Sequence, residues 1–371
     1  MKKLSFFPLF FLFFIHATAQ QQHYNLLVGT YTNTCESKGI YVYDFDTKTG
    51  DFRLKNTSPQ TINPSYLALS PEATLVYSVN EEGAKSTVSA FSFNPADGAM
   101  KYLNKQDAHG ADPCYIIADN NNVITANYSG GTIAVFGRNA DGTLTEAKQV
   151  IQHQGKGPNA QRQESAHVHM TVFSPDKKFV IANDLGTDKI SVYKYDANGG
   201  ANTLTLDHSF AVKSGSGPRH FAFSPNGKLA YLIHELDGTV TAFQYKKGHF
   251  TKIQETTIVA KDFKGDISSA DIHISADVKF LYATNRGDAN DITIFKISSK
   301  GLLSQIGQMS SGGKGPRNFA IDPSGEYVLV GHQYTANIVI FKRDKKTGLL
   351  RPTGKEIEVC APVCLVFTPV K

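Results

Sequence analysis

The sequence predicts an all-β fold of the seven-bladed β-propeller class. Two observations indicate this fold: short strands that end at turns without helical periodicity between them, and a repeat of about 50 residues that runs through the chain. Repeats of roughly this length, built from short strands, are typical of propeller blades with four antiparallel strands each.

The clearest copy of the repeat is GSGPRHFAFSPNGKLAYLIHELDGTVTAF, residues 215–243. Residues 221–224 and 229–233 are expected to form two strands joined by a turn at 225–227, and residues 239–243 a third strand. Aligned at the end of the first strand, the copies read in order Ser70-Pro71, Asp119-Asn120, Ser174-Pro175, Ser224-Pro225, Ser275-Ala276, Asp322-Pro323 and Thr368-Pro369. The chain therefore contains seven first strands.

The two ends of the chain are expected to complete one blade together. Residues 26–31 match the second strand of the repeat and residues 39–45 the third, whereas the matching first strand is at residues 363–367. The strands close into a ring only if the last one joins the first blade. We therefore expect a single propeller domain over residues 20–371, closed by N- and C-terminal strands in one blade, because no linker marks a domain boundary.

Residues 1–19 are expected to be a secretory signal peptide. Two lysines precede an apolar run at residues 6–15 that is too short to span a bilayer, and Ala17-Thr18-Ala19 forms a small-residue cleavage signal. Cleavage near the last of these residues would place a mature chain without a membrane span in the periplasm or outside the cell. A buried N-terminal strand or a membrane anchor is the alternative. The net charge of +5 comes without a basic run, which argues against a nucleic-acid partner.

Four cysteines in an exported chain permit disulfides. Cys360 precedes the first strand of the closing blade and Cys35 follows its second strand, so antiparallel pairing places both at the same end of neighbouring strands. We expect a Cys35–Cys360 disulfide that fastens the chain ends; four free thiols are the alternative. Cys364 and Cys360 are separated along one strand by roughly 13 Å, too far to bridge, and Cys114 belongs to a different blade.

Two positions of the repeat carry polar residues where an apolar pattern is expected. The first, at the head of the first strand, is occupied in order by Ser65, Cys114, His169, Arg219, Ala270, Arg317 and Val363. The second, at the end of the second strand, is occupied by Tyr31, Glu81, Tyr128, Leu185, Glu235, Arg286 and Gln333. Both positions lie at the same end of an antiparallel hairpin, so we expect two rings of side chains around one mouth of the central channel. Adjacent copies carry His169, Arg219, Glu235, Arg286 and Arg317. This uneven distribution favours a functional site over a structural role, which would place similar residues in every copy.

An arginine pair at a channel mouth can bind a carboxylate or phosphate, and a glutamate and a histidine beside it can act as base and acid. For any one of these residues, a paired or solvated surface role is the alternative. His167 and His169 are expected on one face of a strand, but no third ligand accompanies them, so we expect no metal. The polar segment 153–164 belongs to the longest copy and is expected to be either a lid over His169 or an ordinary variable loop.

Four segments also carry a resemblance to a known family: GTYT with GIYVYDFDTKTG, GPRHFAFSPNGKLAYLIHELDGTVTAF, ADIHISADVKFLYATNRG and GPRNFAIDPSGEYVLVGHQ. They resemble the bacterial 6-phosphogluconolactonase family of seven-bladed propellers, which is related to the fungal carboxy-muconate lactonising enzymes. The resemblance covers essentially the whole mature chain and implies lactone ring opening or closing without a required metal. It also implies the active residues His169, Arg219, Glu235 and Arg286. The N-E-L motif of the family reads His-Glu-Leu here, which leaves the glutamate intact.

We therefore expect a 6-phosphogluconolactonase-like enzyme that hydrolyses a sugar lactone to the aldonic acid without a cofactor. Glu235 would activate water, and His169 would protonate the leaving oxygen or share the base role. Arg219 and Arg286 would hold the anionic group of the substrate and the developing oxyanion. The substrate-binding residues are expected to be His167, Arg317 and Glu81.

Two other functions are compatible with the fold. One is an exported propeller that binds a small anionic ligand or a protein partner without catalysis. The other is an oxidoreductase with a quinone-type cofactor, although no cofactor motif is present. The family's named substrate, a phosphorylated sugar lactone, is formed in the cytoplasm, whereas this chain carries an export signal. Either the chain is not exported, or its physiological lactone is a different one.

Overall fold

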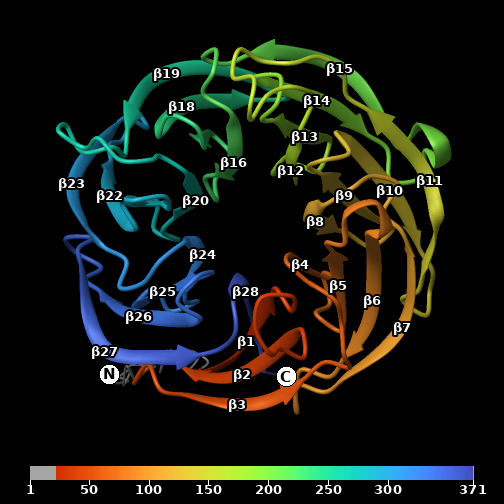
Figure 1. Ribbon diagram of the computed structural model, residues 1–371, viewed down its shortest axis with the longest axis horizontal. Coiled ribbons are helices and arrows are strands. Elements are labelled where there is room, and N and C mark those ends of the chain that lie inside the picture. The colour runs from red at the N-terminus through yellow and green to blue at the C-terminus, as the bar shows by residue number, and fades with distance from the viewer. Residues whose placement is uncertain (1–21, 371) are drawn as a thin grey trace, which may run out of the picture.

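The structure, a computed structural model, describes residues 22–370 as seven four-stranded antiparallel sheets around a central channel (Figure 1). The expected signal peptide lies outside these residues. The innermost strands are β4 (Leu67–Leu69), β8 (Pro113–Ala118), β12 (Val168–Phe173), β16 (Pro218–Phe223), β20 (Ser269–Ile274), β24 (Pro316–Ile321) and β28 (Pro362–Pro369). The second strands are β1 (His23–Thr30), β5 (Leu75–Asn80), β9 (Asn122–Asn127), β13 (Phe179–Asp184), β17 (Leu229–His234), β21 (Phe280–Asn285) and β25 (Tyr327–His332).

The two outer strands of each sheet complete the blades. The third strands are β2 (Ile40–Asp46), β6 (Thr87–Phe93), β10 (Thr132–Arg138), β14 (Lys189–Tyr195), β18 (Thr239–Lys246), β22 (Asp291–Ile297) and β26 (Asn337–Arg343). The outermost strands are β3 (Phe52–Thr57), β7 (Met100–Asp107), β11 (Leu144–Gln152), β15 (Leu204–Ala211), β19 (His249–Thr257), β23 (Leu303–Ser310) and β27 (Leu350–Glu358). The helical segments described are the 3₁₀ turns η1 (Gly83–Lys85) and η2 (Gly200–Asn202), and no helix in residues 22–370 has the length and apolar character needed to cross a membrane.

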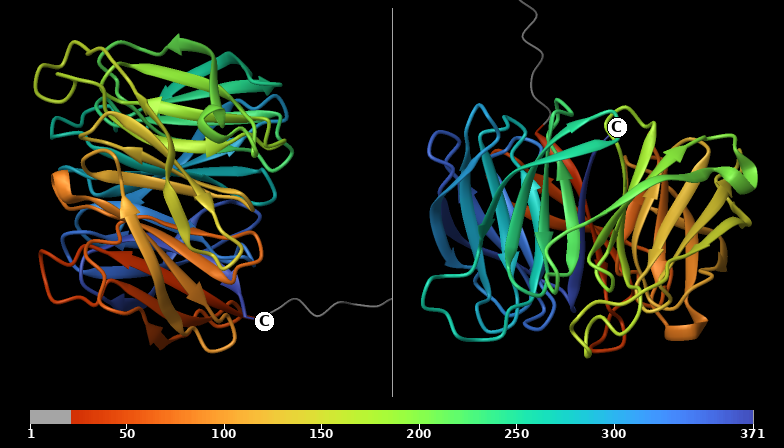
Figure 2. Two further views of the ribbon diagram at one scale, coloured as in Figure 1. Left: turned by 90° about the vertical axis from the view of Figure 1, so that its right-hand side faces the viewer. Right: turned by 90° about the horizontal axis from the view of Figure 1, so that it is seen from above.

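The predicted closure of the ring is confirmed. β28 pairs with β1 in the sheet order β28-β1-β2-β3, and Leu26 lies opposite Phe367. Figure 1 shows β28, in blue, on the channel side of the red strands β1 to β3. The C-terminal end of β28 lies on one face of the ring, and longer loops such as 258–268 project from the opposite face (Figure 2, right). That opposite face carries the channel mouth at which the sequence places the site.

Apolar side chains fill the space between neighbouring blades. Alternate residues of a strand point to opposite faces of its sheet, so each sheet can pack against both of its neighbours. Seven clusters of buried apolar residues lie between the blades, one for each pair of neighbours, including the pair formed by the first and last sheets. Full burial of one large apolar side chain contributes about 1.5–3 kcal/mol, so these interfaces hold the ring rigid around its channel.

The predicted Cys35–Cys360 disulfide is present, with Cα atoms 5.8 Å apart and a sequence separation of 325. It joins the segment after β1 to the segment before β28, so it covalently fastens the strands that close the ring. The other two cysteines, Cys114 and Cys364, are free and buried, and Cys364 packs in the apolar cluster between the first two blades.

Replacing Cys35 with serine should lower the free energy of unfolding by roughly 4–5 kcal/mol, because the bond closes a very long loop in the unfolded chain. Urea unfolding of the wild type and of Cys35→Ser, each with and without dithiothreitol, measures this difference. Cys35→Ser/Cys360→Ser should match the single variant and reduced wild type. Equal unfolding midpoints for oxidised and reduced wild type would contradict the prediction.

Candidate active site

β-Bulges position the side chains at the head of the innermost strands. The pairing register shifts between Val168 and Met170 in β12, and the strand residues on either side of Arg219 in β16 and of Arg317 in β24 show the same shift. A bulge leaves one residue without a ladder partner and redirects its side chain. His169, Arg219 and Arg317 are these unpaired residues. The bulges thus explain why polar side chains at this position reach the mouth of the channel.

Glu235 is the centre of the site. It follows β17, and its backbone N–H donates to the carbonyl of Gly217 (2.8 Å), which ties it to the strand that carries Arg219. Arg219 Nε donates to Glu235 Oε2 at 2.8 Å, and Arg286 Nη2 lies 3.1 Å from the same oxygen. Glu235 is 4% exposed and Arg219 is 1% exposed. The structure therefore brings the predicted glutamate and both predicted arginines into direct contact.

A third arginine, Arg162, completes this cluster and was missed in the sequence. Its Nη2 donates to Glu235 Oε1 (2.5 Å) and to the hydroxyl of Tyr128 (3.2 Å). Arg162 belongs to the segment 153–164, which lies outside the repeat, so no repeat position marked it. The sequence feature that could have indicated Arg162 is the extra length of the copy of the repeat to which it belongs. The contact favours the lid interpretation of this segment over that of an ordinary loop.

His169 faces the same carboxylate. Its Nε2 lies 3.9 Å from Glu235 Oε2, its ring contacts the rings of Tyr128 and His220, and its buried Nδ1 has no hydrogen-bond partner within residues 22–370. Burial, together with the charges of Arg219 and other nearby basic groups, holds the pKa of His169 well below its ordinary value. The imidazole is therefore neutral at pH 7 and able to accept a proton.

The charges around Glu235 decide its ionisation. Burial raises the pKa of the Glu235 carboxyl, but Arg286, Arg219 and Arg162 more than offset this effect and hold the pKa well below its ordinary value. Burial also lowers the pKa of Arg286 to about 10, against the opposing effect of Glu235. A carboxylate stabilised so strongly is a weak base, so its main effect is to hold three guanidinium groups in place.

A second polar group lies at the mouth, around Glu81. Tyr31 donates its hydroxyl hydrogen to Glu81 Oε2 (3.0 Å), and Ser65 donates to Oε1. Burial raises the pKa of Glu81 despite the charge of Arg317. The Arg317 guanidinium lies 5.5 Å from the centre of the Tyr31 ring and makes no hydrogen bond or ion pair with residues 22–370. Among the described residues, Arg317 is thus the arginine of the mouth that is not bound to a carboxylate.

The predicted substrate-binding residue His167 adjoins the Glu235 group through Tyr128, which also contacts Arg162 and His169. It immediately precedes β12, its ring stacks on Tyr128 at 4.5 Å, and its nitrogens lie 3.0 Å from the Tyr128 carbonyl and 3.1 Å from Glu164 Oε1. Within residues 22–370 no group of three or more His, Cys, Asp or Glu side chains is placed to hold a metal ion. Substrate binding by His167 stays a prediction.

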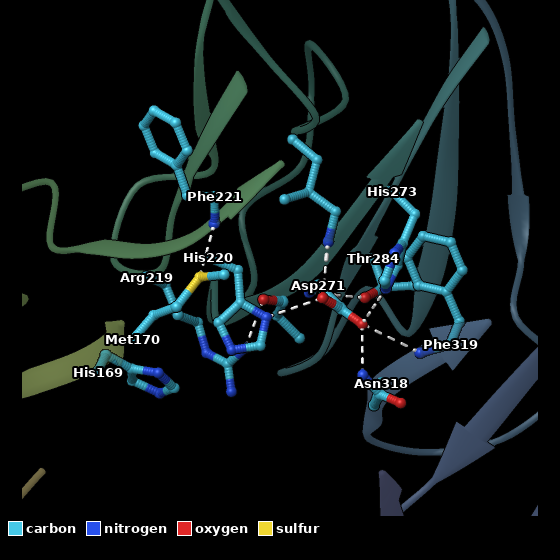
Figure 3. Close-up of polar contacts among 12 residues, drawn as sticks. His169, Met170, Arg219, His220, Phe221, Asp271, His273, Thr284, Asn318 and Phe319 are labelled. Atoms are coloured by element: carbon cyan, nitrogen blue, oxygen red, sulfur yellow. Dashed lines mark hydrogen bonds and ion pairs between the residues drawn. The ribbon is translucent and has the colours of Figure 1, made fainter. Parts of the chain in front are cut away.

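The residues that directly follow the repeat position at the head of the innermost strands form a layer of side chains under the mouth, which we call the floor. The rings of Tyr66 and Tyr115 stack at 4.0 Å, and the ring of His220 meets both edge-on, at 6.2 and 5.3 Å. These residues come from three different blades, so their side chains meet across the channel. The floor also contains Asp271 and Asn318, which are joined by a hydrogen bond of 2.6 Å (Figure 3).

The family description "Lactonase, 7-bladed beta-propeller" matches residues 25–367. The chain belongs to this family of seven-bladed propeller lactonases. It is 36% identical over 345 residues to a 6-phosphogluconolactonase of Bacillus subtilis, covering 92% of this chain and 97% of that protein. A 6-phosphogluconolactonase of Formosa agariphila is 38% identical over 341 residues, covering 90% of this chain and 96% of that one.

A solved structure of a protein named as periplasmic has the same fold. The periplasmic gluconolactonase PpgL of Pseudomonas aeruginosa has a TM-score of 0.88 and 34% identity, covering 94% of this chain and all of that chain (100%). The family resemblance expected from the sequence is confirmed by these relatives and by the match to the family description. Their names differ in the phosphate on the sugar, so the family membership leaves this feature of the substrate open.

Proposed function

We propose that this protein hydrolyses a sugar lactone to the corresponding aldonic acid. One observation carries the proposal: in a chain of the lactonase family, a buried carboxylate, its arginines and a neutral imidazole converge at one channel mouth. An acyl-transfer reaction needs a base for water and fixed positive charge near the carbonyl oxygen, and these groups supply both.

We assign the base role to His169, because its neutral imidazole has an unpartnered nitrogen whereas Glu235 is held by three arginines. Neutral His169 takes a proton from a water molecule as the water oxygen bonds to the lactone carbonyl carbon. Negative charge then develops on the carbonyl oxygen, where Arg219 and Arg286 stabilise it. When the intermediate collapses, the bond from the carbonyl carbon to the ring oxygen breaks, and the protonated His169 returns its proton to that oxygen. Glu235 keeps the arginines aligned throughout, instead of accepting the proton itself.

Arg317 is proposed to bind the anionic group of the substrate. Arg219 and Arg286 are already bound to Glu235, whereas Arg317 has no carboxylate within 4.0 Å among residues 22–370. Four arginines face two carboxylates at the mouth, counting Arg162 and Glu81. This excess of positive charge suits an acidic ligand such as a phosphorylated sugar lactone.

A panel of glucono-δ-lactone and its 6-phosphate, followed by pH-stat or hydroxylamine assay, tests the proposed function. Saturable hydrolysis of either lactone above the spontaneous rate supports it. Ligand-induced stabilisation without turnover of any lactone would reject it in favour of a binding propeller.

The variant Arg317→Gln should raise KM for the phosphorylated lactone by about 10- to 100-fold, since a hydrogen bond to a charged group contributes about 1.5–3 kcal/mol. The KM for glucono-δ-lactone should change little, and Arg317→Lys should recover part of the loss. Equal effects of Arg317→Gln on the two lactones would show that Arg317 does not bind the phosphate.

We further propose that the protein acts outside the cytoplasm. The Cys35–Cys360 disulfide is of a kind that persists in oxidising compartments. The N-terminal sequence has the features of a secretory signal, and a relative at 34% identity is named as periplasmic. Cell fractionation together with N-terminal sequencing of the purified protein tests this; a mature chain that retains residues 1–19 in the cytoplasm would overturn it.

A further inference from the structure

Asp271 lies in the floor of the mouth and binds several hydrogen-bond donors (Figure 3). His220 Nδ1 lies 2.8 Å from its Oδ1, while His273 Nε2 and Asn318 Nδ2 lie 2.9 and 2.6 Å from its Oδ2. Asp271 is 2% exposed. Burial raises its pKa, but the neighbouring histidines and hydrogen bonds more than offset this and hold the pKa well below its ordinary value. Asp271 is therefore a carboxylate that only accepts hydrogen bonds.

The ionised Asp271 determines the tautomer of His220. Since Asp271 only accepts, the hydrogen of the neutral imidazole must be on Nδ1, which leaves the lone pair on Nε2. Burial and the charge of Arg219 lower the pKa of His220 to about 4, so the ring stays neutral at pH 7. His220 Nε2 lies 3.2 Å from Arg219 Nη1. Since a guanidinium nitrogen can only donate, Arg219 Nη1 donates a hydrogen bond to the lone pair of His220 Nε2.

The hydrogen bonds of Arg219 leave one of its nitrogens unused. Nε donates to Glu235, and Nη1 donates to the carbonyl of Ala270 (2.5 Å) and to His220 Nε2. Nη2 donates no hydrogen bond to residues 22–370. A guanidinium group is planar, so fixing Nε and Nη1 also fixes the direction of the Nη2 hydrogens. Figure 3 shows the guanidinium beside His220, with His169 nearby.

We propose that Asp271 and His220 are positioning residues that orient Arg219, so that its Nη2 donates to the lactone carbonyl oxygen as negative charge develops there. This inference rests on the proposed lactone hydrolysis. His220 as the opposite tautomer, or as an imidazolium, would present a hydrogen to Arg219 Nη1 and push the guanidinium away. A purely structural floor would need only the ring contacts of His220 and would not depend on which nitrogen carries the hydrogen.

Two substitutions of His220 separate these roles. The asparagine of His220→Asn places its amide near the position of Nδ1 and retains a partner for Asp271, but it cannot reach Arg219. The longer glutamine of His220→Gln reaches the Nε2 position, where its carbonyl oxygen can accept from Arg219. We expect His220→Asn to lower kcat by about 10²-fold with KM within about threefold, as for loss of one oxyanion donor, and His220→Gln to recover at least about tenfold of this loss.

The result that overturns the inference is equal kcat for the two His220 variants, or a loss of kcat that follows the melting temperature alone. A wild-type kcat in His220→Asn would overturn it as well and would leave the proposed lactonase activity intact. In each of these cases the wild type hydrolyses the lactone, so the two proposals fail separately.

Nitrogen-15 NMR of the wild type provides a readout that does not depend on turnover. His220 should show the Nδ1–H tautomer from pH 8 down to about pH 5, and the Arg219 Nη hydrogens should exchange more slowly in the wild type and His220→Gln than in His220→Asn. An Nε2–H tautomer, or Arg219 hydrogens unaffected by His220→Asn, would overturn the positioning role even if lactone hydrolysis is confirmed.

Discussion

Glu235→Gln is expected to lower kcat/KM for lactone hydrolysis by at least about 10³-fold. The carboxylate binds Arg162, Arg219 and Arg286 simultaneously. A glutamine amide offers one accepting oxygen and turns an N–H group toward a donor, so the guanidinium groups lose their common partner and repel one another. Steady-state assays with the best lactone of the panel measure the loss.

The same substitution should lower the free energy of unfolding by roughly 3–5 kcal/mol, because it removes the counter-charge of buried guanidinium groups. Circular dichroism therefore has to establish the temperature range in which the variant is folded, and the kinetics are measured within that range. Glu326→Gln is the matched control: Glu326 pairs with Lys342 and Lys345 near the β24–β25 turn, and its replacement should leave kcat/KM unchanged. A folded Glu235→Gln protein with the wild-type rate would reject the assignment of the site.

The repeat made the fold predictable from the sequence. Each copy has its own turn chemistry; at the β16–β17 turn, for example, the hydroxyl of Ser224 accepts from the Leu229 N–H (3.0 Å) and Gly227 adopts a φ of +66°. Such local signals repeat at a nearly constant spacing, which gives the number of blades. The out-of-phase start then implies the pairing of β28 with β1, because a propeller without this pairing would leave two open sheet edges.

The floor of the mouth could not be predicted in the same way. In a regular strand, neighbouring residues such as Arg219 and His220 point to opposite faces of the sheet. The bulge in β16 removes this alternation, so both side chains reach the channel. No residue type in the sequence marks a bulge of this kind. The floor therefore emerges only from the three-dimensional pairing of strands.

The arginines show a related limit. The repeat positions placed Arg219, Arg286 and Arg317 at the mouth, but they gave no information on which of them Glu235 would bind. From the sequence we therefore expected Arg219 and Arg286 to hold both the anionic group of the substrate and the developing oxyanion. In the structure both contact Glu235, so the proposed mechanism keeps them for the developing oxyanion and gives the anionic group to Arg317. Distances of a few ångströms decide which arginines bind Glu235 and which is left for the substrate. These distances depend on side-chain conformations that the spacing of a repeat does not specify.

His169→Gln should lower kcat by about 10²- to 10⁴-fold, the range expected for loss of a general base, with a small change in KM. It should also remove the acidic limb of the pH–rate profile. In the wild type His169 has to be neutral, and its pKa lies well below the ordinary value of about 6.5, so kcat/KM should stay level from pH 8 to below pH 6.5. At lower pH the imidazole gains a proton, and the rate should then fall about tenfold per pH unit.

Acid also affects the stability of the fold, and this effect has to be separated from the effect on catalysis. His220, His234 and His332 have pKa values lowered to about 4, chiefly by burial. Below about pH 6.5 the unfolded chain therefore binds more protons than the folded chain, so the free energy of unfolding decreases as the pH falls toward 4. Circular dichroism at each pH identifies the range in which the protein is still folded, and rates are compared only there. If Glu235 were the base, His169→Gln would retain most of the wild-type kcat and the pH–rate profile of the wild type. An active His169→Gln variant with the wild-type pH–rate profile would therefore transfer the base role from His169 to Glu235.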